Sequence, residues 1–200
     1  ATRTESSAAS DVYKRQIINP VKEKLKKEFS KFIFGENEDN LSSVLIKELI
    51  KRKESLVFAE SCSGGLLSSS ITAIPGSSQV FKGSIISYSN DLKQSLLNIP
   101  ENLIKKFGAV SEEVAETMAI NAKEKLNSDW SIAISGIAGP SGGNKEKPVG
   151  LIYISIAGPN NHITNIKKIF SSTRNRIEIQ RLSVNVCLNS LRLILLSSGK

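Results

Sequence analysis

The chain of 200 residues has few of the side chains on which most metal sites and disulfide frameworks depend. It contains one histidine, His162, and two cysteines, Cys62 and Cys187, which lie far apart and form no CxxC pair. We therefore expect no zinc site, no disulfide framework and no Ser-His-Asp triad. Two isolated cysteines fit a reducing compartment, so a cytoplasmic location is expected.

Long apolar runs and aromatic residues are also scarce. No apolar run approaches the roughly 18 residues that span a bilayer, so we expect a soluble protein without a membrane partner. Aromatic residues make up 6% of the chain and are not interleaved with basic ones, so nothing indicates nucleic-acid binding. The net charge is +8, and residues 162–200 hold seven basic side chains and one acidic. Such a stretch is typical of a solvated helix face or of a surface that attracts a phosphate.

The N-terminal segment differs in composition from the rest of the chain. Residues 1–16 are polar, rich in small side chains and without periodicity, so we expect them to be disordered or to be a sequence scar. Apolar residues at helical spacing over 20–34 predict an amphipathic helix, and residues 17–40 are interpreted as a helical linker. A compact domain is expected over 41–197.

Within that domain, short apolar runs alternate with helical patterns. The runs Trp130–Ser135 and Leu151–Ala157 have no polar face, which predicts strands buried on both sides of a sheet. The alternation predicts a three-layer α/β/α sandwich around a mostly parallel or mixed sheet. The expected strands are 55–59, 81–88, 130–135, 151–157 and 163–170, and the expected helices are 41–53, 66–74, 91–97, 103–107, 111–126 and 174–196.

A candidate nucleophile stands between the first strand and the helix after it. Ser61 lies in the sequence ESCSGG, where the N–H groups of a helix start can stabilise an oxyanion. The pattern equally fits a tight turn in which Ser61 or Ser63 caps the helix. It does not match the G-x-S-x-G elbow, because position 59 is alanine.

A serine needs a base, and the sequence offers a lysine. In YSNDLK, Tyr88 ends an apolar strand and Lys93 follows one helical turn later. A lysine partly buried at a strand end can have its pKa lowered enough to accept a proton. The segment taken alone also fits a surface lysine on an amphipathic helix.

A glycine-rich loop, residues 136–150, is a candidate ligand site. Its backbone N–H groups can bind carboxylate or phosphate oxygens, and Ser135 directly before it can donate a hydroxyl hydrogen bond. The loop lacks the GK[ST] ending of a P-loop and the dinucleotide fingerprint. Spacing therefore supports neither ATP nor NAD as a cofactor.

Several segments together resemble one family. In order they are AESCSGG at 59–65, PGSS at 75–78, KGSIISYSNDLK at 82–93, GAVSEEVAETMA at 108–119, ISGIAGPSGG at 134–143 and KPVGLIYI at 147–154. They resemble the CinA C-terminal domain family across nearly all of 41–197. The family includes amidases that convert nicotinamide mononucleotide (NMN) to nicotinate mononucleotide and ammonia, a reaction of pyridine-nucleotide salvage.

The resemblance implies a role for each matching residue. Ser61 would attack the carboxamide carbon, Lys93 would accept the serine proton and pass it to ammonia, and Tyr88 would orient groups or relay protons. It implies no metal and no cofactor. The substrate-binding residues would be Ser63, Gly64, Gly65, Ser135, Gly136, Gly139 and Arg174.

The chain departs from the family at one motif. The family carries Gly-Asp-Arg before its last helix, and the matching residues here are Ser172, Thr173 and Arg174. Arg174 is still expected to pair with the substrate phosphate. Cys62, next to the nucleophile, is interpreted as a small buried residue rather than as a second nucleophile.

Two further expectations follow from the resemblance. The segment before residue 41 resembles the junction of longer members, in which a molybdopterin-binding-like domain precedes the amidase, and a homodimer is expected. The alternative functions are a ligand- or partner-binding module without turnover, in a protein of competence or DNA-damage responses, and hydrolysis of another small amide.

Overall fold

The computed structural model describes residues 4–197, and the chain divides into two units between Asn40 and Leu41. In the first unit, helix α1 (Thr4–Glu28) occupies most of the segment that was expected to be disordered; residues 1–3 of that segment lie outside the described part. No glycine or proline interrupts residues 4–19, and the helix continues through Pro20. Phe29 and Phe32 follow the helix rather than extending it.

The second unit contains one mixed sheet of five strands in the order β2-β1-β3-β4-β5. Strands β2, β1 and β3 are parallel, whereas β4 is antiparallel to both of its neighbours. The mixed sheet confirms the predicted fold class. All five predicted strands are present, and they differ from the prediction only in where some of them begin or end. Their bounds are β1 Leu56–Glu60, β2 Phe81–Ile86, β3 Trp130–Gly136, β4 Leu151–Ala157 and β5 Ile163–Ile169.

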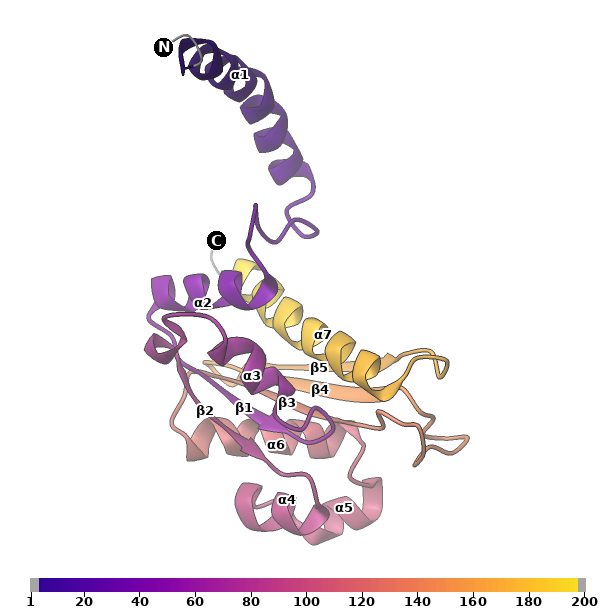
Figure 1. Cartoon of the computed structure of the whole chain (residues 1–200). Helices are drawn as coiled ribbons and strands as arrows, with labels where there is room; N and C mark the ends of the chain where they lie inside the picture. The colour runs from indigo at the N-terminus through magenta and orange to yellow at the C-terminus, as the bar shows by residue number, and fades with distance from the viewer. Residues whose placement is uncertain (1–3, 198–200) are drawn as a thin grey trace. The chain divides into compact units, whose positions relative to one another are not determined.

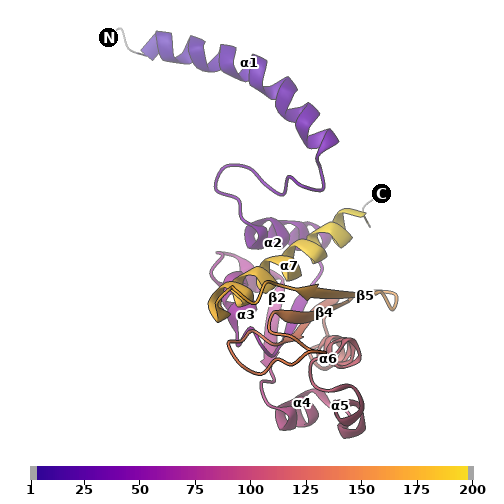
Figure 2. The same ribbon diagram turned by 90° about the vertical axis from the view of Figure 1, so that its right-hand side faces the viewer.

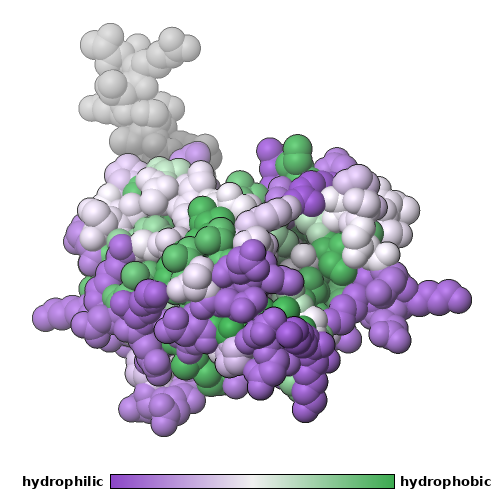
Figure 3. All heavy atoms as spheres, turned by 90° about the horizontal axis from the view of Figure 1, so that it is seen from below, coloured by the Kyte–Doolittle hydropathy of each residue, from purple (hydrophilic) through white to green (hydrophobic). Residues whose placement is uncertain are grey.

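Helices cover both faces of this sheet (Figures 1 and 2). One face carries α2 (Leu41–Arg52), α3 (Leu66–Thr72) and α7 (Arg176–Ser197), with a short 3-10 helix at Ser77–Gln79. The other carries α4 (Asn90–Leu97), α5 (Glu101–Phe107) and α6 (Glu112–Lys125), and the surface seen from that side is mainly hydrophilic (Figure 3). The layers are therefore helix, sheet and helix, as predicted.

Side-chain size differs between the two faces of the central strands. Phe58, Ile132 and Ile134 point into the core beneath α2, α3 and α7. Ala59 and Ala133 alternate with them and pack with α6 in the second core, where small side chains let the helix approach the sheet. The central strands are thus buried on both faces, as their unbroken apolar composition predicted.

Helix α7 is long and apolar enough to cross a bilayer by length and composition alone, a pattern that the search for apolar runs did not find. In the structure it lies on the sheet, and 44% of its most apolar window is buried. Ile179, Cys187 and Leu191 are fully buried in the first core. Packing within this unit therefore explains the buried apolar residues of the helix, whereas Ile177 and Leu196 are exposed.

The topology brings five chain segments to one edge of the sheet. Because β1, β2 and β3 are parallel, their carboxyl ends share this edge. The antiparallel partners add the start of β4 and the end of β5, since Leu151 pairs with Ile169. The residues that follow or precede these ends are the ones in which the sequence motifs lie. Crevices outside the carboxyl ends of strands are the usual ligand sites of α/β sheets.

The N-terminus of α6 offers a test of this architecture. Serine is a favoured residue directly before a helix, and the hydroxyl of Ser111 accepts from the N–H of Val114 at 3.3 Å and donates to the carbonyl of Gly108 at 2.9 Å. Replacing it by alanine should lower the free energy of unfolding by about 1 kcal/mol in urea titrations. The matched control is Ser95→Ala on the exposed surface of α4, which should leave stability nearly unchanged. Equal stability of the two variants would contradict the capping role.

Candidate active site

Ser61 lies directly after β1, at the edge where the strand ends meet. Its backbone N–H donates to the carbonyl of Ile134 in β3 at 3.1 Å, which extends the sheet by one residue and fixes the serine. The side chain is 8% exposed and lines a cavity of about 270 Å³. Ser61 is thus held rigidly at the base of a small pocket.

Lys93 comes from α4 and reaches the same pocket. Its side chain is 1% exposed, and its Nζ lies 3.0 Å from the Oγ of Ser61. Nζ also lies 2.8 Å from the carbonyl oxygen of Ser87 and 3.3 Å from that of Tyr88. Burial lowers the pKa of Lys93 below its ordinary value of 10.5. The buried amine, not a surface lysine, is therefore what the structure places beside Ser61.

The three contacts of Lys93 are compatible with both protonation states of its amine, since an ammonium can donate to all three oxygens and a neutral amine to two of them. A neutral amine has two N–H donors and one lone pair, and the carbonyls of Ser87 and Tyr88 can accept both donors. The remaining direction faces the hydroxyl of Ser61. No carboxylate of the described residues forms a salt bridge with Lys93. The pair can therefore transfer a proton from the serine to the lysine.

A buried carboxylate lies beneath the nucleophile. Glu60, the last residue of β1, has no exposed surface and accepts six hydrogen bonds from the start of α3 and from β2. The donors are the hydroxyls of Ser63, Ser68 and Ser84 and the backbone N–H groups of Gly65, Leu67 and Ser68. The carboxylate thus ties the glycine turn and α3 to the end of β1.

This arrangement corrects one part of the sequence interpretation. The N–H groups at the start of α3 were expected to be available for an oxyanion, but those of Gly65, Leu67 and Ser68 donate to Glu60. Other N–H groups line the pocket. Those of Cys62 and Ala138 are among the pocket N–H groups without an acceptor within residues 4–197, and they are our candidates for stabilising negative charge.

One arginine connects two walls of the pocket. Arg176, the first residue of α7, donates through Nη1 to the carbonyl of Gly139 at 2.7 Å and through Nη2 to the hydroxyl of Tyr88 at 2.9 Å. Tyr88 belongs to the loop after β2, and Gly139 to the loop after β3. A third cation, Lys147, donates to the carbonyls of Phe107 and Val110 at 2.5 and 2.7 Å. The glycine-rich loop is therefore anchored to the rest of the domain on two sides.

Comparison with known proteins agrees with this fold. The model of the CinA C-terminal domain matches residues 38–195. A CinA-like protein of Prochlorococcus marinus subsp. pastoris is 88% identical over 99% of this chain, which covers 46% of that protein. The chain belongs to the CinA C-terminal domain family. It spans about half the length of the curated relatives it matches, and another, from P. marinus strain SARG, is 46% identical over 97% of the chain and 46% of that protein.

Solved structures of CinA-family proteins superpose on the chain. The competence/damage inducible protein CihA of Agrobacterium tumefaciens is 32% identical with a TM-score of 0.76, covering 82% of this chain and 98% of that one. A competence-damaged protein (CinA) superfamily protein of Escherichia coli is 27% identical with a TM-score of 0.73, covering 83% and 96%. Both solved structures are covered almost over their full length.

The residues that the CinA resemblance singled out fall into three groups. Ser61, Lys93, Tyr88, Ser135, Gly136 and Gly139 line the same small pocket. The hydroxyl of Ser135 already donates to the carbonyl of Ala109 at 2.7 Å, so toward a ligand it can only accept. Ser63, Gly64 and Gly65 line a neighbouring cavity of about 520 Å³ instead.

Arg174 forms the third group. It lines a cavity of about 790 Å³ beside the start of α7 and does not line the pocket of Ser61. The arginine that does line that pocket is Arg176, which the motif comparison missed because it lies two residues beyond the Gly-Asp-Arg position. The available signal was Asn175, whose side chain accepts from the N–H of Glu178 and places the helix start at residue 176.

The structure also decides between the other nucleophilic and basic side chains. Cys62 is 6% exposed, and burial raises the pKa of its thiol to about 12, so it stays protonated at neutral pH. His162 lies beyond Ala157, which pairs with Ser131 at the opposite edge of the sheet from Ser61. Its ring contacts Trp130 and Thr164 there. Neither side chain competes with the Ser61–Lys93 pair.

The role of Glu60 can be tested by changing its acceptor oxygens. In Glu60→Gln an amide NH₂ would face N–H donors, leaving buried groups without partners, which should cost about 1–3 kcal/mol of unfolding free energy. Chemical denaturation measures this, with Glu124→Gln on the exposed side of α6 as the matched control. Wild-type stability of Glu60→Gln would show that the six hydrogen bonds do not hold the turn.

Proposed function

We propose that the domain is an amidase that hydrolyses the carboxamide of NMN to nicotinate mononucleotide and ammonia. The observation that carries this proposal is the 3.0 Å contact between the hydroxyl of Ser61 and the amine of Lys93, which is buried and forms no salt bridge with a carboxylate of residues 4–197. A serine activated by a neutral lysine is suited to acyl transfer at neutral pH. Membership of the CinA family, some of whose members carry out this reaction, supports the substrate.

The reaction proceeds in two stages. Lys93 takes the proton of Ser61 while the serine oxygen bonds to the carboxamide carbon, and the carbonyl oxygen becomes an oxyanion near the N–H groups of Cys62 and Ala138. Lys93 then gives its proton to the amide nitrogen, the C–N bond breaks, and ammonia leaves with an acyl-serine behind it. Water, deprotonated by Lys93, cleaves the ester, and the proton returns to Ser61. No step requires a metal or a redox cofactor.

The shape and charge of the pocket fit the two ends of a pyridine nucleotide. The cavity above Ser61 is small, about 270 Å³, which suits an aromatic amide. Arg176, which lines this pocket, and Arg181, which lines the neighbouring cavity, provide positive charge beside the space for the ring. The phosphorylated end of a mononucleotide would lie toward these arginines.

Release of ammonia from NMN tests the proposal directly. We expect the wild-type chain to release ammonia and Ser61→Ala and Lys93→Ala each to reduce kcat by roughly 1,000-fold or more, since the two groups act as a unit. A coupled ammonia assay measures this, and Lys105→Ala, an exposed lysine of α5, is the control.

The alternatives give different results in the same assay. A folded wild-type chain that releases no ammonia from NMN, but does so from other small amides in a substrate panel, would assign another substrate. A chain inactive toward every amide, whose Ser61→Ala variant binds ligands or partners as the wild type does, would be a binding module. Full activity of Lys93→Ala would contradict the lysine as the base.

The pH dependence follows from the burial of Lys93. Only the neutral amine can accept the serine proton, and burial lowers the pKa of Lys93, so the neutral fraction appears at a lower pH than for an exposed lysine. We therefore expect kcat/KM to rise with pH along a limb whose midpoint lies below 10.5. Lys93→Arg should lack this limb because its guanidinium stays charged. A limb centred at the ordinary lysine value, or a rate that falls through this range, would contradict the mechanism.

A further inference from the structure

We infer that Arg176, and not the arginine at the family motif position, is the residue that selects a substrate with a phosphate group. The identity of the substrate rests on the proposed function. The choice of arginine rests on contacts, burial and charge at the start of α7.

The guanidinium of Arg176 is fixed in place before any ligand arrives. Nη1 is bound to the carbonyl of Gly139 at 2.7 Å and Nη2 to the hydroxyl of Tyr88 at 2.9 Å. A guanidinium has five N–H donors, so these two contacts leave three free for a ligand. A prepositioned fork loses little side-chain entropy when it binds a phosphate.

Arg176 also borders three cavities at this edge. It lines the pocket of Ser61, the neighbouring cavity beside the glycine turn, and the larger cavity beside α7. No aspartate or glutamate lines the first two. Glu178 lines the third, where its carboxylate accepts from the backbone N–H of Asn175 at 2.9 Å. An anion next to Ser61 would therefore meet positive charge from Arg176, while the nearby carboxylate of Glu60 does not line the pocket and already accepts six hydrogen bonds.

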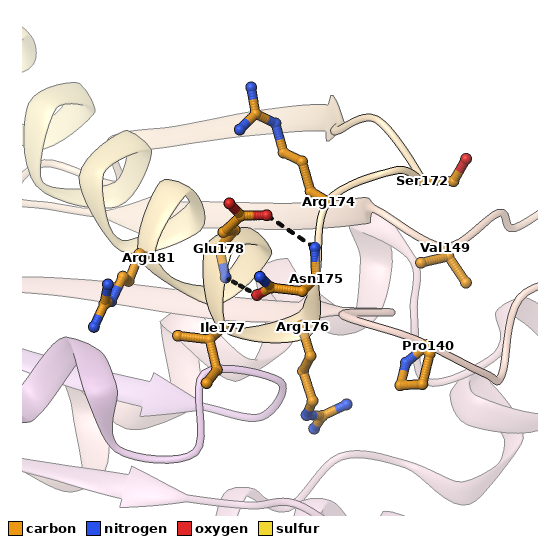
Figure 4. Close-up of a pocket in the computed structure, with 9 residues that line it drawn as sticks. All are labelled: Pro140, Val149, Ser172, Arg174, Asn175, Arg176, Ile177, Glu178 and Arg181. Atoms are coloured by element: carbon orange, nitrogen blue, oxygen red, sulfur yellow. Dashed lines mark hydrogen bonds between the residues drawn. The ribbon is translucent and has the colours of Figure 1, made fainter.

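Arg174 has a different position. Figure 4 shows its side chain extending to the opposite side of the α7 start from that of Arg176. It borders the cavity that contains Glu178 and not the pocket that contains Ser61. Thr173, which stands where the family has aspartate, bonds through its hydroxyl to Ser171 at 2.8 Å and makes no contact with the guanidinium of Arg174. Arg174 is thus neither held by a neighbour nor directed at the nucleophile.

Tyr88 adds a second contact for the same ligand group. Its hydroxyl oxygen accepts from Arg176, which leaves its own proton free to donate. The side chain is 60% exposed and borders both the pocket of Ser61 and the neighbouring cavity. A phosphate oxygen at the boundary between the two cavities could accept from Arg176 and Tyr88 together. The ligand class is therefore a phosphate monoester attached to an amide-bearing ring.

Binding measured without turnover tests this inference. In a Ser61→Ala background, isothermal titration calorimetry would compare NMN with nicotinamide riboside, which lacks only the phosphate. We expect Ser61→Ala to prefer the nucleotide, and Arg176→Gln added to it to weaken nucleotide binding roughly 10- to 100-fold with little change for the riboside. Arg174→Gln in the same background should keep the preference. Lys51→Gln, an exposed lysine of α2, controls for net charge.

Each other outcome overturns the inference. Loss of the preference in Arg174→Gln but not in Arg176→Gln would return the role to the family arginine. If Arg176→Gln weakened the binding of NMN and of nicotinamide riboside equally, the arginine would only hold the pocket walls in place. Should that variant not fold, judged by circular dichroism, Arg176→Lys replaces it, with a partial loss of the preference expected and an unchanged preference contradicting the role. The calorimetry measures binding and not ammonia release. A wild-type chain that is inactive in the ammonia assay would therefore refute the amidase, and the binding comparison between the two arginines would still hold.

Discussion

The site depends on one buried carboxylate. Glu60 ends β1, and its two oxygens collect the donors of the glycine turn and of the first turn of α3. A short helix of seven residues has little stability of its own, so an anion at its start both caps it and fixes where it begins. Ser61 is the next residue after Glu60, and its direction is set by the same turn. The N–H groups at the start of α3 consequently stabilise the carboxylate of Glu60 and not a charge that forms during the reaction.

Much of the fold could be predicted from the sequence because its patterns are local. The strands at 130–136 and 151–157 have no polar face, and a strand of that kind must be covered on both sides. The cap of α6 at Ser111 follows from short-range chemistry as well, because serine is favoured directly before a helix. The first part of helix α1 was missed, because residues 4–16 are mostly small and polar and show no helical spacing of apolar residues, whereas its part from Pro20 to Glu28 lies within the predicted helix. Propensity without a buried face is a weak signal.

Part of the site was predictable from the sequence. Residues in local motifs could be found, whereas contacts between segments that are far apart in the sequence could not. Ser61 and Lys93 follow two different strands, and only the order β2-β1-β3 places those strand ends together. Motif resemblance supplied the pair, whereas their 3.0 Å separation required the topology. Arg176 could not be found in this way, because its importance comes from bonds to Gly139 and Tyr88, which are far from it in sequence. The hydrogen bonds from backbone N–H groups of α3 to Glu60 could not be predicted from the sequence either.

The pairing of β1 with β2 contains an irregularity whose consequence reaches the reacting atoms. Leu56 pairs with Phe81, but Val57 pairs with Gly83, so β2 holds one extra residue at its beginning. This offset brings Glu60 level with Ile86, the last residue of β2, and Ser87 directly after the strand supplies a carbonyl that accepts from Lys93. If β1 and β2 paired without this offset from Leu56 onward, the carbonyl of Ser87 would lie one residue, about 3.3 Å, further along the strand direction. A bulge at the far end of an edge strand thus sets the register of the nucleophile and its base, and deleting Lys82 would remove the bulge while keeping Glu60 level with Ile86.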